Sequence, residues 1–264
     1  MIKAAATCAY MRRLHELQAC FVLGLVALYG CASPGVAESD KHRTAEASRI
    51  YVQKGIQYME NGQLDVALED IKHALVLDDA NVAAHNALAV LYERTGQLQD
   101  TERQFQQALA LDASDPATLN NYGRFLCGQG QYARAQDYFE LARRDPLYAT
   151  PWIVLTNAGV CSRRAGNPKK ADSTLREALT LNAGFAPALL EMASIKLDGM
   201  QFADAHAYFQ RYEAAARPTA DALWLAVRIE SGLQDQVALN AYLHELRSRF
   251  PDSPEARLSE RRFQ

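Results

Sequence analysis

The pattern of apolar and polar positions repeats along the chain from residue 48 onward. Each unit contains a turn, and neighbouring turns are 34 residues apart at Gly62, Gly96 and Gly130. Five turns align: Gly62-Gln63-Leu64, Gly96-Gln97-Leu98, Gly130-Gln131-Tyr132, Gly166-Asn167-Pro168 and a degenerate Met200-Gln201-Phe202. A small residue follows each turn (Ala67, Thr101, Ala135, Ala171, Ala205), then a large apolar one four places on (Ile71, Phe105, Phe139, Leu175, Phe209). Residues four apart share one helix face, so the pattern predicts a helix on each side of every turn.

Each recurring residue type has a physical reason. Glycine at the turn adopts a left-handed conformation without steric cost and ends the first helix of a pair. Small residues let the two helices approach closely, and the following large residue fills the space between repeats. The first helices carry small residues at Gly55, Ala89, Gly123, Gly159 and Ala193. One helix pair cannot bury its own apolar side, so we expect the pairs to stack.

These spacings resemble the tetratricopeptide (TPR) pattern, which implies an all-α fold: a right-handed solenoid of about six helix-turn-helix repeats. The repeats are expected at residues 48–81, 82–115, 116–149, 152–185, 186–219 and 220–253. The sixth is the weakest, held mainly by Trp224, Tyr242 and Leu246. Two extra residues near Pro146 to Pro151 predict a local irregularity, and the charged tail 254–264 is interpreted as a solubilising cap.

The N-terminal segment, residues 1–30, is expected to be a signal peptide, because Lys3, Arg12 and Arg13 precede a short apolar run. The run ends in Leu28-Tyr29-Gly30-Cys31, which resembles a bacterial lipobox and makes Cys31 the expected lipidation site. Tyr29 departs from the usual residue type there, and a plain signal peptide or an uncleaved anchor are the alternatives. Met11 offers a second start besides Met1. Residues 31–47 are interpreted as the lipidated cysteine and a flexible tether.

Two cysteines, Cys127 and Cys161, remain in the repeat region. They fall on the first helices of neighbouring repeats, two helix positions apart, so one can face forward and the other back. A disulfide is geometrically reasonable and would stabilise the fold by roughly 3 to 4 kcal/mol. The alternative is a pair of buried free cysteines that act as small apolar residues.

Charge and composition argue against several function classes. A net charge of -3 disfavours a non-specific nucleic-acid binder. The string Gly128-Gln129-Gly130 matches a loose dinucleotide fingerprint, but it follows a predicted helix rather than a strand. The six histidines are scattered without the close pairs of a metal site. No catalytic constellation stands out, so we expect no enzyme activity, cofactor, metal or small-molecule substrate.

A closer resemblance rests on three segments: Asn120-Asn121-Tyr122-Gly123-Arg124-Phe125-Leu126-Cys127, Asp145-Pro146-Leu147-Tyr148 and Asn157-Ala158-Gly159-Val160-Cys161. They are similar to the type IV pilus biogenesis and stability lipoproteins of the PilF/PilW type. The likeness extends through Ala222-Leu223-Trp224 and the stretch from Arg249 to Ala256. It implies a pilotin, a lipoprotein that helps the outer-membrane secretin pore localise and assemble. It also implies a Cys127–Cys161 disulfide and, since Ala32 follows the lipidated cysteine, sorting to the outer membrane.

We expect the partner to bind in a concave groove formed by the first helices. The repeat register predicts a lining of Val52, Ile56 and Met59, then Asn86, Val90 and Glu93, then Asn120 and Arg124. Asparagine side chains can donate to and accept from a bound backbone. Alternatively, some of the apolar residues belong to the core between repeats. As a function, the alternative to the secretin pilotin is a TPR lipoprotein that scaffolds another envelope complex, such as cell-wall enzymes.

Overall fold

The computed structural model describes residues 34–263, and every regular element in that range is an α-helix. Within that range, six consecutive helix pairs are followed by one terminal helix, which confirms an all-α fold of about six helix-turn-helix repeats. The first helices are α2 (Pro34–Glu60), α4 (Val82–Arg94), α6 (Pro116–Gly128), α8 (Pro151–Arg164), α10 (Ala186–Asp198) and α12 (Ala220–Leu233). The second helices are α3 (Leu64–Leu77), α5 (Leu98–Leu111), α7 (Tyr132–Ala142), α9 (Pro168–Leu181), α11 (Phe202–Ala215) and α13 (Gln236–Arg249), and α14 (Pro254–Arg262) follows.

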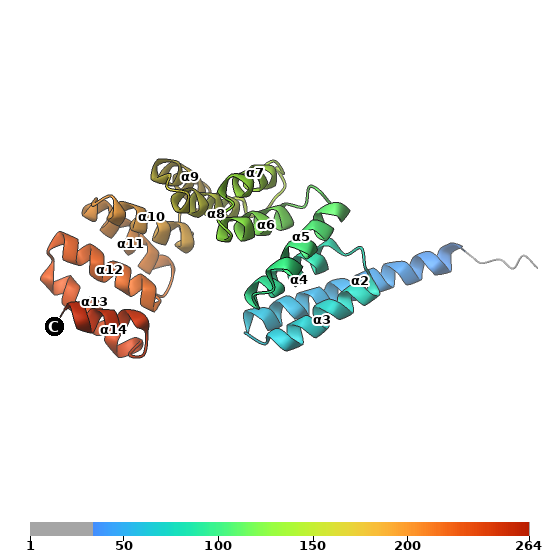
Figure 1. Ribbon diagram of the computed structural model, residues 1–264, viewed down its shortest axis with the longest axis horizontal. Helices are drawn as coiled ribbons and strands as arrows, with labels where there is room; N and C mark the ends of the chain where they lie inside the picture. The colour runs from blue at the N-terminus through green and yellow to red at the C-terminus, as the bar shows by residue number, and fades with distance from the viewer. Residues whose placement is uncertain (1–33, 264) are drawn as a thin grey trace, which may run out of the picture.

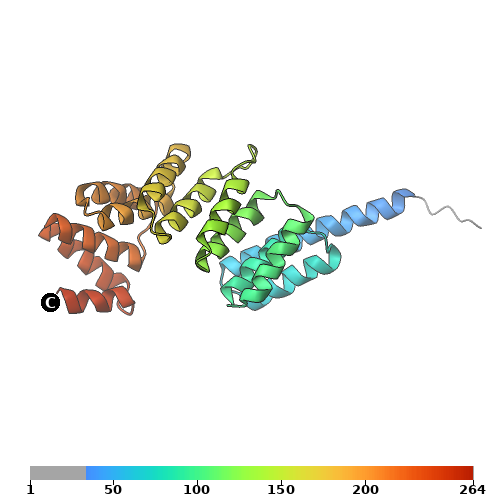
Figure 2. The same ribbon diagram turned by 45° about the horizontal axis from the view of Figure 1, so that its top comes forward.

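The pairs stack in chain order into an arch, with α2 at one end and α13 and α14 at the other (Figure 1; Figure 2). Each first helix contacts its own second helix and the first helices of the neighbouring repeats. The backbones of neighbouring second helices lie farther apart, and these helices meet through long side chains, such as Tyr242 of α13 and Glu213 of α11. The first helices therefore form a continuous inner layer, and the second helices fan out on the other side.

The turns inside the repeats use left-handed backbone. Gly62, Gly96, Gly130 and Gly166 all have φ between 74° and 77°, which confirms the role predicted for these glycines. The last two repeats depart from this rule, because Met200 (φ 55°) and Gln234 (φ 61°) occupy the left-handed position. A side chain with a Cβ is strained there.

The small residues on the first helices mark places of close helix approach. A Cβ on Gly123 would lie 2.7 Å from Phe139, and one on Gly159 would lie 2.7 Å from Leu175. These are the large residues that the repeat pattern predicts to fill the space between helices. Both Phe139 and Leu175 are fully buried.

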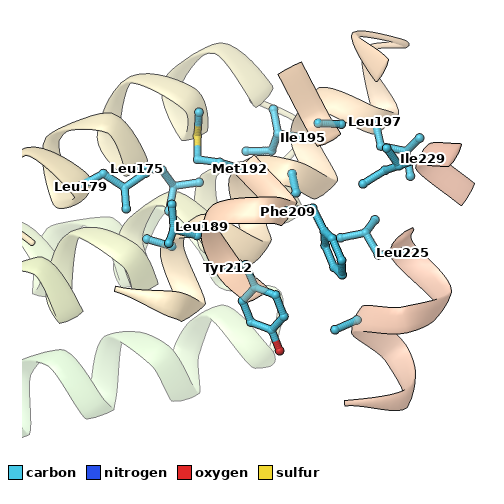
Figure 3. Packing of buried hydrophobic residues seen from close by; sticks show 14 of the residues in the cluster. Leu175, Leu179, Leu189, Met192, Ile195, Leu197, Phe209, Tyr212, Leu225 and Ile229 are labelled. Carbon is cyan, nitrogen blue, oxygen red and sulfur yellow. The ribbon is translucent and has the colours of Figure 1, made fainter. Parts of the chain in front are cut away.

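Buried side chains form a series of clusters along the arch. One cluster joins α2, α3 and α4. A second joins α4 to α8 and includes both cysteines. The largest lies among α8 to α12, where Phe209 and Leu225 meet and Leu175, Leu189 and Met192 pack together (Figure 3). Smaller clusters fix α12, α13 and α14 to one another.

Helix α2 corrects the expectation of a flexible tether before residue 48. It starts at Pro34, so the segment up to Ala47 continues the first helix of repeat one. Alanine and glutamate favour a helix there, and Asp40–Arg43 and Glu46–Arg49 ion pairs span single turns. Ser48 is the first fully buried residue of α2 among those described, and its hydroxyl donates to the carbonyl of Ala74 at 2.8 Å.

The tail, interpreted from the sequence as a solubilising cap, contains a helix. Residues 254–262 form α14, which packs on α12 and α13 and buries Ala256 and Ser259. The irregularity expected near Pro146 lies between α7, which has 11 residues where the other second helices have 14, and the start of α8 at Pro151.

The signal peptide and Cys31 lie outside the described residues. In the part of the chain that is described, no helix combines the length and apolarity needed to cross a bilayer.

Candidate functional site

The apolar start of the predicted groove is only partly open. Val52 and Met59 are each 4% exposed and belong to the core between α2, α3 and α4. Their assignment to the groove is corrected, because α3 and α4 both pack on α2 and cover these side chains. Ile56, by contrast, is 37% exposed. Of the three residues, Ile56 alone offers substantial surface to a partner.

Asparagine side chains join successive first helices to each other. The Asn121 amide nitrogen donates to Asn86 Oδ1 at 3.1 Å, between α6 and α4. The Asn157 amide nitrogen donates to Asn120 Oδ1 at 2.9 Å, between α8 and α6. Asn120 is only 5% exposed, so its predicted role in binding a partner backbone is corrected: it holds two helices together. Asn86 is half-buried and uses its carbonyl oxygen in the same way.

A bidentate ion pair connects α4 and α6 on the inner layer. Arg124 Nη1 lies 3.1 Å from Glu93 Oε1, and Nη2 lies 2.5 Å from Oε2. The two side chains are 42% and 22% exposed, respectively, so both reach solvent while paired. Two parallel bonds fix the guanidinium plane, which makes this pair geometrically well defined.

The pair forms one wall of a pocket of about 250 Å³ between α4, α6 and α8. Its lining is Glu93, Arg124, Cys127, Gly128, Asn157, Val160 and Arg164. We call this hollow the inner pocket. It combines two cationic side chains, one carboxylate, an amide and an apolar valine, a mixture suited to the side chains and backbone of a polypeptide.

Asn157, Val160 and Arg164 were not predicted from the sequence. The sequence nevertheless contains the information needed to predict Val160. It occupies the position in repeat 152–185 that Val90 occupies in repeat 82–115 and Arg124 in repeat 116–149. Extending the groove register by one repeat would have found it. Val90 itself is half-buried and packs against the cores on both sides of α4.

Polar contacts continue between the remaining first helices. Arg94 of α4 donates to the Met59 carbonyl of α2 at 2.7 Å. Arg163 of α8 lies 3.1 Å from Glu191 and 3.0 Å from Asp198 of α10. Asp198 in turn lies 3.8 Å from Arg228 of α12. Side-chain contacts therefore bridge every neighbouring pair of first helices, which fixes the curvature of the inner surface.

A disulfide joins Cys127 of α6 to Cys161 of α8, with 5.7 Å between the two Cα atoms. Both residues are buried within the second core cluster. Cys127 also lines the inner pocket, so the covalent link lies directly behind the candidate binding surface.

The polar groups most suggestive of chemistry have structural partners. His85 contacts Gln104 and the Asp79 carbonyl, and His206 Nδ1 lies 2.6 Å from Glu230 Oε1. Gly130 of the loose dinucleotide string is a repeat turn. Across the described residues, no group of three or more His, Cys, Asp and Glu side chains is arranged to hold a metal ion.

In comparison with known proteins, residues 105–137 match the family model of the tetratricopeptide repeat. The chain is similar to the type IV pilus assembly protein PilF of Pseudomonas aeruginosa strain PAO1, with 29% identity over 233 residues, 87% of this chain and 92% of the relative. A solved structure of PilF from that species has 28% identity and a TM-score of 0.71, covering 83% of this chain and 98% of the other. The crystal structure of PilW, described as a widely conserved type IV pilus biogenesis factor, has 32% identity and a TM-score of 0.73, covering 81% and 98%.

Proposed function

Because the chain belongs to the PilF/PilW-like family of TPR proteins of type IV pilus biogenesis, we propose that it is a pilotin that binds the pilus secretin. In this role it promotes localisation of the secretin and its assembly into the multimeric pore, and pili and twitching motility depend on it. The protein acts by binding rather than by catalysis.

The inner pocket is the observation that carries this proposal. It opens on the layer of first helices, where Arg124 and Glu93 are fixed by their ion pair and Val160 adds apolar surface. A rigid surface loses little conformational entropy when a partner binds. An extended segment of the secretin would lie along this surface and place its side chains in the hollow.

The anchor is the second part of the proposal. Lipidation of Cys31 would hold the protein at the periplasmic face of the outer membrane, where the secretin pore assembles. The lipobox-like sequence before Cys31 and the following Ala32 support this location.

The test compares secretin multimer and monomer on gels of heated and unheated membrane extracts. We expect the multimer to be lost on deletion of the protein, and to be reduced or mislocalised with Cys31→Ala. Val160→Glu, which places a charge in the inner pocket, should reduce the multimer. Its matched control is Val76→Glu on α3, because Val76 is already 81% exposed.

Unchanged multimer in the deletion strain would overturn the secretin role and leave a scaffold for another envelope complex. If Val160→Glu and Val76→Glu reduce the secretin multimer equally, at equal protein levels, the inner pocket is not the binding site.

A further inference from the structure

The turn between the two helices of a repeat occurs six times, and one copy differs sharply in charge. Residues 163–170, from the end of α8 to the start of α9, contain Arg163, Arg164, Lys169 and Lys170 and no acid, a formal charge of +4. The corresponding windows 59–66, 93–100, 127–134, 197–204 and 231–238 carry -2, -1, +1, -2 and -1. The whole chain has a net charge of -3, so this concentration of cations is local.

Three of these four cations are available to a partner. Arg163 is occupied, because it holds α10 through Glu191 and Asp198. Arg164, Lys169 and Lys170 are exposed, and within the described part of the chain none of them forms an ion pair. We call these three residues the basic turn.

Hollows lie on both sides of the basic turn. Arg164 is part of the lining of the inner pocket. Lys169 lines a second pocket of about 450 Å³ between α8, α9 and α10, together with Pro168, Ile195, Gly199 and Gln201. The same pocket includes two carboxylates, Asp172 and Asp198, which are paired with Lys196 and Arg163 of its lining. The cations therefore stand on a ridge between two concave surfaces, each of which includes apolar atoms.

We propose that the basic turn binds an acidic stretch of a protein partner, whose neighbouring residues enter the inner pocket. This inference rests on the proposed protein-binding function and adds the chemistry of the segment that is recognised. A polypeptide fits better than a lipid surface, because a chain can cross a ridge and occupy the hollows on either side. Like-signed charges at the rim of a groove raise the rate of encounter with an oppositely charged partner.

The experiment uses a fluorescent peptide of alternating Glu and Gly, with an alternating Gln and Gly peptide as its neutral control. Binding to the purified full chain is measured by fluorescence anisotropy. The test variant combines Arg164→Gln, Lys169→Gln and Lys170→Gln. The matched variant combines Arg257→Gln, Arg261→Gln and Arg262→Gln on α14, where all three side chains are also exposed, so both variants lose the same charge.

We expect the acidic peptide to bind and the neutral one not to bind. The test variant should bind about tenfold more weakly, since three exposed charge contacts of a fraction of a kcal/mol each are lost. The α14 variant should stay within about twofold of the native chain, and added salt should weaken native binding. Equal weakening in both triple variants would overturn the proposal, because only net charge would then matter.

A parallel measurement uses vesicles of equal parts phosphatidylglycerol and phosphatidylethanolamine, compared with phosphatidylcholine vesicles. A lipid anchor contributes to both, so excess binding to the anionic vesicles measures the charge effect. Such an excess, lost in the test variant and without peptide binding, would assign the basic turn to a lipid surface and overturn the proposal. Absent peptide binding, with secretin multimer still sensitive to Val160→Glu, would overturn this inference while the proposed function stands.

Discussion

The joint between α6 and α8 and the joints from α8 through α10 to α12 connect equivalent helices by different chemistry. The first uses a disulfide and an amide hydrogen bond, Asn157 to Asn120. The later joints use Arg163, Asp198 and Arg228, all charged. The backbone geometry of a TPR array therefore does not determine which side-chain interactions connect neighbouring first helices. The interaction at each contact determines which condition weakens it: reductant in the middle of the arch, and salt and pH toward its C-terminal end.

The largest effect should come from removing the disulfide. Replacing Cys127 and Cys161 together by alanine should lower the free energy of unfolding by roughly 3 to 4 kcal/mol, given the sequence separation of 34. The measurement is a urea titration with and without reductant. Reductant should lower the urea midpoint of the native chain and leave the midpoint of the double variant unchanged. If reductant does not change the native midpoint, the prediction is wrong.

Close helix packing near the disulfide gives the next effect. Gly123→Ala should cost about 2 kcal/mol, because its Cβ would lie 2.7 Å from Phe139 and 3.2 Å from the Ala135 carbonyl oxygen. Ala193 occupies the same position in the fifth repeat, so Ala193→Gly is the reverse control and should cost about 1 to 2 kcal/mol, through helix propensity and the loss of a buried methyl group. Urea titration measures both, and a Gly123→Ala chain as stable as the native one would refute the packing argument.

The charged joints should show salt dependence. Arg163→Gln should lower stability by about 1 kcal/mol at low salt, because Glu191 and Asp198 lose their shared partner. The deficit should shrink at high salt, where the native pairs are screened. Arg176→Gln, which removes a contact to Asp172 within α9, is the control and should cost less. A deficit that is independent of salt would mean that Arg163 acts through packing.

The turns offer a stabilising change at the C-terminal end. Met200→Gly should raise stability by about 0.5 to 1 kcal/mol, since it relieves a left-handed residue at φ 55° at a smaller entropy cost. Gly166→Ala, at the corresponding turn of the fourth repeat, should lower stability, because it places a Cβ on left-handed backbone at φ 77°. Thermal unfolding followed by circular dichroism measures the stability of both variants. If both changes stabilise the chain, or both destabilise it, the argument from left-handed backbone at these turns is wrong.

The smallest effect concerns pH. Burial raises the pKa of the Glu213 carboxyl above its ordinary value of 4.5, and Tyr242 donates to this carboxyl at 2.8 Å. The folded chain thus binds this proton more tightly than the unfolded chain does. The contribution of Glu213 to stability is full below pH 4.5 and is lost as pH rises through the raised pKa. Glu213→Gln should flatten this part of the stability–pH curve, while Cys127→Ala with Cys161→Ala should leave its shape unchanged.

The repeat period was sufficient to predict the helix pairs, the turn glycines and the close contacts at Gly123 and Gly159. It did not distinguish core from groove in the first repeat, because the burial of Val52 and Met59 depends on how α3 and α4 both pack on α2. Nor did it predict that Asn120 would be used within the fold, since an amide can pair with a neighbouring helix or with a ligand equally well. The stretch from Pro34 to Ala47 combines small and charged residues, a composition compatible with either coil or helix.

Helix α2 makes the N-terminal connection a stiff arm. The part before Ser48 has about 14 residues, and at about 1.5 Å per residue it sets a stand-off of about 20 Å between its start and the body. Each residue added to the arm would also turn the body by about 100° about the arm's axis. The direction in which the inner pocket points is therefore encoded in the number of residues in the arm. Single insertions there would re-aim the binding surface without touching it.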